Sequence, residues 1–286
     1  MRFTLPRFTS LLLDGVWDSV YHGPALDTLT STGTAIGATL AATTIATGDS
    51  FQIKNQNGTQ PALLLQAWAD VQVAGELRIR SPKMHDNVDA IRTRTQIGIL
   101  EPMLPWGLAQ PLYPQDVETV ELAGSAVAGD VESVVQQIYY SDLPGQNARL
   151  MSWDQIKSRV RNLIGQRIAI TLGSTAGYNG ARAINADADL LKANQDYAVM
   201  GMTTNTECAA ICLRGPDTGN LRCSVPGEPA LIHHTNYWFK RLSIAFGLPL
   251  IPVINSANKG GTLIDCVNDE NGGTANVVIW LAELGN

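Results

Sequence analysis

Hydrophobic and polar residues alternate along several short stretches of this chain. Residues 71–80 read VQVAGELRIR, in which apolar or small residues take every second position and mostly polar residues lie between them. Residues 167–172 repeat this period of two, and residues 117–122 and 277–281 are rich in β-branched side chains. Because successive side chains of a strand point to opposite faces, the pattern predicts β-strands in all four stretches.

Turn-forming residues separate the predicted strands. They occur at Asn57-Gly58, Asn179-Gly180, Gly215-Pro216 and Asn271-Gly272-Gly273. The uncharged stretch 28–48 is rich in Thr and has few large apolar residues, so we expect a strand or loop there and not a membrane-spanning helix. Short strands divided by Gly, Pro and Asn are typical of a sandwich or barrel, and the predicted fold class is all-β.

One segment near the middle of the chain has helical periodicity instead. Ser152 and Gln155 have the spacing of a capping box, which satisfies backbone donors at a helix start. Apolar residues then recur three or four positions apart, at Trp153, Ile156, Val160, Leu163 and Ile164. Gly165 follows as a stop signal, so we predict an amphipathic helix over residues 151–164.

The two halves of the chain share four sequence landmarks in the same order. Residues 62–65, 77–82, 106–108 and 134–138 of the first half correspond to residues 198–201, 211–216, 246–248 and 277–281 of the second half. The offset drifts slowly along the chain, as insertions in loops would cause. We therefore predict two related β units on either side of the helix.

These patterns divide the chain into four parts. Residues 1–14 form an N-terminal arm, residues 15–150 the first unit, residues 151–164 a linker helix and residues 165–286 the second unit. The arm contains two Arg and two Phe, and it either docks on a neighbouring layer or packs as a terminal strand on its own unit.

Charge is scarce in this sequence. The chain of 286 residues has 20 Lys and Arg and 26 Asp and Glu, which gives 16% charged residues and a net charge of −6. A soluble domain usually has about 25% charged residues. The negative balance argues against a protein whose main role is nucleic-acid binding, and the low charge is consistent with extensive subunit contacts.

Cysteine and histidine residues offer one candidate metal site. Cys208, Cys212 and Cys223 with the pair His233-His234 supply the ligand types of a zinc site. The closely spaced Cys pairs of zinc sites are missing, so we expect Cys208 and Cys212 to be buried on one face of a strand. His233 and His234 are expected on a strand, pointing to opposite faces. With Cys266, the chain has four cysteines, too few for a disulfide-rich scaffold of this length, so reduced thiols fit at least as well as disulfides.

Three other motifs invite a chemical role, and each is better explained by structure. Residues 173–177 resemble a nucleophile elbow but have Thr at its centre, and they lack the Lys of a phosphate-binding loop. The acidic stretch 265–271, and Asp187 with Asp189, carry oxygen ligands for Ca²⁺ without the spacing of an EF-hand. We expect a glycine-rich loop at the first place and a solvated hairpin at the acidic residues.

The basic residues of the predicted helix form the only basic concentration in the sequence. They are Lys157, Arg159 and Arg161, with Arg167 nearby. They either face anionic lipid or packaged nucleic acid, or they form the solvated side of the helix, and we favour the solvated side.

Duplicated β units, low charge and the lack of a catalytic motif together resemble the double jelly-roll major capsid proteins of tailless icosahedral viruses and bacteriophages. The resemblance covers about residues 15–284 and rests on architecture and on the internal repeat. It implies two tandem eight-stranded jelly rolls joined by a short amphipathic helix. No loop is long enough for an obvious tower, so a compact member is implied.

The resemblance also implies a function. The chain is expected to be a structural subunit of the virion shell, assembled in the host cytoplasm as a homotrimer that forms a pseudo-hexagonal capsomer. Its expected partners are neighbouring capsomers, minor capsid or vertex proteins, and an internal membrane or packaged genome beneath the shell. We expect no enzymatic activity, no catalytic, cofactor-binding or metal-binding residues and no small-molecule substrate.

Two other functions remain open from the sequence. A two-domain cupin-like metalloenzyme is also a duplicated β-barrel, but it needs a set of His and carboxylate ligands that this chain does not supply at the usual spacing. A virion spike or carbohydrate-binding β-sandwich protein would expose aromatic residues, whereas most Trp residues here lie in apolar stretches.

Overall fold

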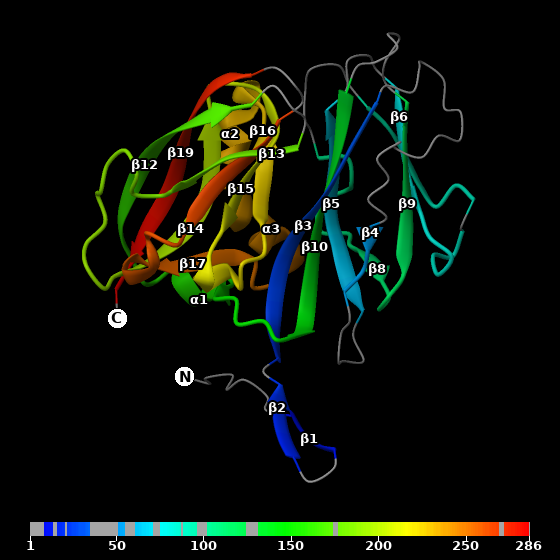
Figure 1. The fold of residues 1–286 in the computed structure, drawn as a ribbon, viewed down its shortest axis with the longest axis horizontal. Helices are drawn as coiled ribbons and strands as arrows, with labels where there is room; N and C mark the ends of the chain where they lie inside the picture. The colour runs from blue at the N-terminus through cyan, green and yellow to red at the C-terminus, as the bar shows by residue number, and fades with distance from the viewer. Residues whose placement is uncertain are drawn as a thin grey trace.

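The computed structural model describes residues 9–13, 16–20, 22–34, 51–54, 61–70, 75–86, 88–95, 102–123, 131–173, 177–268 and 272–285. Its first two strands, β1 (Thr9–Leu13) and β2 (Val16–Val20), pair with each other as an antiparallel hairpin. The hairpin projects away from the remaining sheets (Figure 1). Strand β1 therefore falls in the predicted arm and its partner β2 falls in the predicted first unit.

After this hairpin, the described residues of the first half form two antiparallel sheets of four strands each. Its strands within the described residues are β3 (His22–Thr34), β4 (Phe51–Gln52), β5 (Ala62–Asp70), β6 (Glu76–Arg80), β7 (Ile91–Arg94), β8 (Gln110–Leu112), β9 (Val117–Ala123) and β10 (Val131–Pro144). One sheet has the order β3-β10-β5-β8 and the other has the order β4-β9-β6-β7. The prediction for residues 117–122 is confirmed by β9. The stretch 71–80 contains β6 in its second part, and residues 71–74 lie outside the described residues.

The second half of the chain also forms two antiparallel sheets. Its strands, again counted within the described residues, are β11 (Leu150–Met151), β12 (Val160–Leu172), β13 (Gly177–Ala183), β14 (Asp196–Thr204), β15 (Cys208–Arg214), β16 (Cys223–Gly227), β17 (Ile251–Asn255), β18 (Leu263–Asn268) and β19 (Gly273–Leu284). The orders are β11-β17-β14-β19-β12 and β13-β18-β15-β16. The strands predicted over residues 167–172 and 277–281 are confirmed inside β12 and β19.

The same strand order occurs in both halves. If β3 to β10 and β12 to β19 are each numbered one to eight, the described sheets of each half have the orders 1-8-3-6 and 2-7-4-5. Strand β11 is an additional strand at the edge of one sheet of the second half, where it lies next to β17. The paired sequence landmarks fall on the third, fourth and eighth strands and on the connection before the sixth strand, in each half. The landmarks are therefore equivalent positions in the strand order.

The predicted helix over residues 151–164 is wrong in its extent. Helix α1 covers only Trp153–Ile156, and strand β12 begins at Val160. The Gln155 side chain does accept a hydrogen bond from the Ser152 backbone N–H, as the capping box requires. From Val160 onward, β12 pairs with β19 along its whole length and thereby satisfies its backbone groups. This long-range pairing outweighs a local helical pattern that contains β-branched residues.

Two of the predicted turns have different outcomes. Gly215-Pro216 is confirmed as a turn that leads into the 3₁₀ helix η1 (Pro216–Thr218). Asn179-Gly180 is not a turn, because both residues lie in β13 at an irregularity of its pairing with β18. Gly180 has a φ of +72° there, which only glycine adopts without strain. Asn57-Gly58 and Asn271 lie outside the described residues.

Helical structure is concentrated in the connection between β16 and β17. It contains the 3₁₀ helix η2 (Pro229–Leu231), α2 (Ile232–Thr235) and α3 (Trp238–Phe246), and a further 3₁₀ helix, η3 (Ser256–Asn258), follows β17. Gly201 on β14 lies against this connection, since a Cβ at residue 201 would be 2.0 Å from the Thr235 carbonyl oxygen. Within the described residues, no helix is long and apolar enough to cross a membrane.

The buried apolar residues form two clusters. One fills the space between the two sheets of the first half, with Leu64 and Ile138 from one sheet and Leu77 and Ile79 from the other. The second cluster fills the second half and also includes residues of β3, β5 and β10 from the first half, namely Leu26, Leu65, Trp68, Val135 and Tyr139. The two halves lie side by side in Figure 1, and this second cluster joins them through a continuous core.

Candidate functional site

The four cysteines are buried in the second half and belong to its sheets. Cys208 and Cys212 lie on β15, Cys223 begins β16, and Cys266 lies on β18. All four are free thiols. Burial raises the pKa values of the Cys212 and Cys223 thiols above the ordinary value. These two thiols are therefore protonated in the folded chain.

The two adjacent histidines lie on a helix and not on a strand, so that prediction was wrong. His233 and His234 belong to α2 and their ring centroids are 4.2 Å apart. Arg241 of α3 contacts His234 Nδ1. The described residues hold no group of three or more His, Cys, Asp or Glu side chains placed to bind a metal ion. The structure thus does not bring the candidate cysteines and histidines together.

The candidate acidic residues are paired with basic side chains. Arg182 binds Asp187 and Lys259 binds Asp189. The expectation of a solvated hairpin is wrong at Asp265. This carboxylate is buried on β18, between the side chains of Arg214 and Arg222. Residues 174–176 and 269–271 lie outside the described residues, so the glycine-rich motif and the rest of the acidic stretch are not fully described.

The basic residues near the predicted helix do not form one helix face. Lys157 pairs with Asp154 next to α1. Arg159 donates to the Gly285 carbonyl oxygen, while Arg167 lies on β12 and donates to Asn276. Their side chains are exposed or half-buried.

A further candidate surface is the contact between the two halves. Thr28 of β3 donates to the Arg222 carbonyl oxygen at 2.8 Å, and Gln137 of β10 donates to the Ser224 carbonyl oxygen at 2.6 Å. Thr30, further along β3, donates to the hydroxyl of Tyr178. The outer face of β3 and β10 therefore packs on the outer face of the sheet β13-β18-β15-β16, and these three hydrogen bonds join the two faces.

Tryptophans reinforce this contact. Trp68 of β5 is fully buried and its indole N–H donates to the Ala209 carbonyl oxygen at 2.7 Å. Its ring meets Trp238 of α3 edge to face at 5.7 Å between centroids, and Trp106 meets Trp238 at 5.3 Å. The Trp238 indole N–H donates to Gln137 Oε1. Aromatic pairs of this geometry add to the energy of burial, so the two halves are held as one body.

An arginine–carboxylate cluster occurs at the equivalent place in each half. In the second half, Asp265 is 2.9 Å from Arg214 Nε and 3.3 Å from Arg222 Nη2. Arg222 also stacks on the Tyr178 ring, 3.7 Å from its centroid. This cluster lies under the first half, because Thr28 and Thr30 bind Arg222 and Tyr178.

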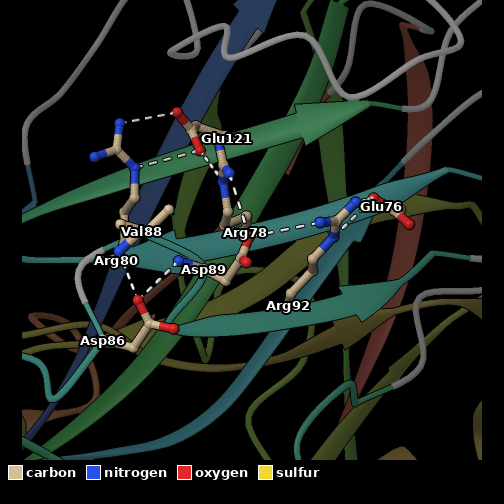
Figure 2. A network of polar contacts seen from close by, with 8 residues as sticks. All are labelled: Glu76, Arg78, Arg80, Asp86, Val88, Asp89, Arg92 and Glu121. Carbon is tan, nitrogen blue, oxygen red and sulfur yellow. Dashed lines mark hydrogen bonds and ion pairs between the residues drawn. The ribbon is translucent and has the colours of Figure 1, made fainter.

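The matching cluster of the first half is on β6 and β9 (Figure 2). Glu121 of β9 is paired with Arg78 and with Arg80, whose Nη2 is 3.1 Å from Glu121 Oε1. Burial by itself would raise the pKa of Glu121, but the two arginines outweigh it and hold the pKa below the ordinary value. On the neighbouring strand β7, Arg92 pairs with Glu76.

Sequence reasoning missed these clusters although part of the signal was present. Arg80 and Arg214 occupy the same place in the landmark pair 77–82 and 211–216. The partners Glu121 and Asp265 are far from them in sequence, and strand pairing alone brings them together.

No family model matches the chain, and no curated protein matches it. Among solved structures, the PBSX exported protein XepA has a TM-score of 0.23 and 8% identity over 99% of this chain and 100% of that chain. The major capsid protein P2 of bacteriophage PM2 has a TM-score of 0.24 and 9% identity over 92% of this chain and 98% of that chain.

A third similar structure is the Macrobrachium rosenbergii nodavirus, with a TM-score of 0.23 and 10% identity over 99% of this chain and 97% of that chain. All three TM-scores are below 0.5, so these similarities carry no argument about the function.

Proposed function

We propose that this chain is a structural subunit of an icosahedral virion shell, and that each half is an eight-stranded jelly roll. The strand order supports the jelly rolls. In the described sheets of each half, the neighbours 1 and 8, 2 and 7, 3 and 6, and 4 and 5 lie next to each other. Neighbours whose positions add up to nine arise when one long hairpin is wrapped into a two-sheet barrel, which is the jelly-roll arrangement.

The observation that carries the proposal is the internal contact between two units of equal strand order. One chain presents two similar wedges side by side, joined by a buried core that includes Trp68. Shell proteins need repeated lateral contacts of this kind, and the low charge of the sequence suits large contact faces. A pair of wedges in each chain allows three chains to form a pseudo-hexagonal capsomer.

The remaining parts of the proposal follow from this role. The subunit forms a homotrimer that packs against neighbouring capsomers and vertex proteins, above an internal membrane or the packaged genome. It resides in the virion after assembly in the host cytoplasm. It has no enzymatic activity and no small-molecule substrate.

The oligomeric state of the purified chain tests the proposal. We expect sedimentation velocity to give a species of three 30.7 kDa chains, and electron microscopy of concentrated samples to give closed shells or flat hexagonal arrays. A monodisperse monomer at every concentration, with no assembly by microscopy, would contradict the proposed function. Stoichiometric iron or manganese in the purified protein would instead favour a metalloenzyme.

A further inference from the structure

We propose that a hollow on the outer face of β12, β19 and β14 is a binding site for a small organic anion, which it holds by a carboxylate or phosphate group. The hollow has a volume of about 310 Å³, and ligand pockets usually have volumes of about 300–1,000 Å³. Its lining includes Arg167, Thr203, Asn205, Ile232, Asn276 and Val278. The ligand is bound and not converted, and the inference does not rest on the proposed shell function.

Three strands and one helix form the hollow. Arg167, Val278 and Thr203 lie in one row across β12, β19 and β14, because Val278 is the register partner of both other residues. Residues that are paired in this way in an antiparallel sheet point to the same face. Gly201 of β14 lies on this face too and is in contact with the end of α2. Helix α2 therefore forms a wall beside the row, and its Ile232 lines the hollow.

The hydrogen-bond acceptors of the lining side chains are already engaged within the chain. Asn276 Oδ1 accepts from Arg167 Nη2 at 2.6 Å, and Asn205 Oδ1 accepts from the Asn276 backbone N–H at 2.7 Å. The hydroxyl of Thr204, which also lines the hollow, donates to the Thr206 carbonyl oxygen and accepts from the Thr206 N–H.

Several donors of the same side chains have no partner among the described residues. The Arg167 guanidinium makes one hydrogen bond there, so Nε–H and both hydrogens of Nη1 are left over. The Nδ2 groups of Asn205 and Asn276 and the hydroxyl of Thr203 also make no hydrogen bond to that part of the chain. A carboxylate or phosphate group only accepts hydrogen bonds, and a bond from an arginine to such a group is among the strong ones. The unused donors therefore select an oxyanion.

The charge around the hollow also suits an anion. None of its lining residues is acidic. The pKa of the Asp187 carboxyl is held below its ordinary value by the Ala169 N–H and by Arg182, and the charge of Arg167 adds to this effect. Asp187 is thus already neutralised by Arg182, and the charge of Arg167 is left in excess.

The apolar part of the wall indicates that the anion is an organic one. Val278 lies between Arg167 and Thr203 in the row, and the Ile232 side chain is 51% exposed. An inorganic ion on the arginine would leave these two side chains in water, whereas a ligand with a short apolar body would cover them and gain the free energy of their burial. The ligand class is therefore a carboxylate or a phosphate ester with a small apolar body.

Calorimetric titration of the wild-type chain, in a buffer free of phosphate and carboxylates, tests the proposal with four probes. These are hexanoate, hexyl phosphate, acetate and inorganic phosphate. We expect saturable binding of one six-carbon probe per chain with a Kd below about 10 mM, at least about tenfold tighter than that of its short counterpart. The tighter of the two six-carbon probes distinguishes a carboxylate from a phosphate ester.

Two variants separate the two parts of the site. Arg167→Gln should weaken both six-carbon probes by about tenfold or more, and Ile232→Ser should remove most of the advantage of the long probes over the short ones. Arg94→Gln is the matched control, because Arg94 is an exposed strand arginine on β7 of the first half, outside the hollow. It should bind the probes like the wild-type chain, and circular dichroism should show all three variants folded.

The absence of saturable binding by either six-carbon probe would overturn the inference. Unchanged binding in Arg167→Gln would overturn it as well, because the oxyanion would then not be held by this arginine. Equal affinity for acetate and hexanoate, and for the two phosphates, would exclude an organic ligand class.

Discussion

Trp68 connects the two halves of the chain, and its replacement measures the strength of that connection. The side chain is fully buried, it packs edge to face on Trp238, and its indole N–H binds the Ala209 carbonyl oxygen. Trp68→Phe keeps most of the ring and removes this donor. The Ala209 carbonyl oxygen then loses this donor in a buried site, which should lower the free energy of unfolding by about 1–3 kcal/mol. Trp68→Ala also removes the ring and should cost about 3–5 kcal/mol.

Urea denaturation, monitored by tryptophan fluorescence and by circular dichroism, measures the loss of unfolding free energy in both variants. We expect one cooperative transition for the wild-type chain, because the cluster around Trp68 belongs to both halves. Trp153→Phe is the matched control, since Trp153 is half-buried on α1 and stacks with Lys240 at the surface. Its cost should be below about 1 kcal/mol.

The reasoning would be refuted by a Trp68→Phe variant as stable as the Trp153→Phe variant. Two separate wild-type transitions, with Trp68→Ala moving neither of them, would refute it as well. Either result would mean that the halves do not depend on each other for stability.

Three further predictions concern single sites. Burial raises the pKa of Glu118 to about 8, so the folded chain keeps a proton that the unfolded chain releases near pH 4.5, and stability falls as the pH rises between these values. Glu118→Gln should remove this pH dependence and raise the free energy of unfolding at pH 8 by about 2–4 kcal/mol. Equal urea midpoints for the wild-type chain and the variant at pH 8 would contradict this. Gly201→Ala should lower stability by about 2–4 kcal/mol because its Cβ meets the Thr235 carbonyl oxygen, and an unchanged thermal midpoint would exclude the clash. The four buried thiols should react with a thiol reagent only in denaturant, so a thiol that reacts rapidly in the native chain would show that its burial is incomplete.

Much of the strand content was predictable because local patterns carried it. The alternation over residues 167–172 and the β-branched stretches at residues 117–122 and 277–281 lie in strands whose inner positions are buried. Gly215-Pro216 formed a turn because Pro has a fixed φ and no N–H to pair. Such signals act over a few residues, so the sequence alone shows them.

Other features could not be predicted because distant pairing decides them. Val160, Leu163 and Ile164 fit a helix by spacing, but β19 offers β12 a partner along its length, and the strand forms. Asn179-Gly180 has the signature of a turn, yet β18 draws it into a strand. His233 and His234 fit a strand equally well by local pattern, and the connection between β16 and β17 is helical instead.

The sequence by itself determined that the chain is built from many short strands, that its charge is low, and that landmarks of one half recur in the other. Only the tertiary structure decided which strands are neighbours, and hence that Arg80 meets Glu121 and that Arg214 meets Asp265. The reason is physical: side-chain alternation fixes which face of a strand is apolar, whereas backbone hydrogen bonds are the same for every strand. The choice of partner therefore depends on the packing of the whole chain.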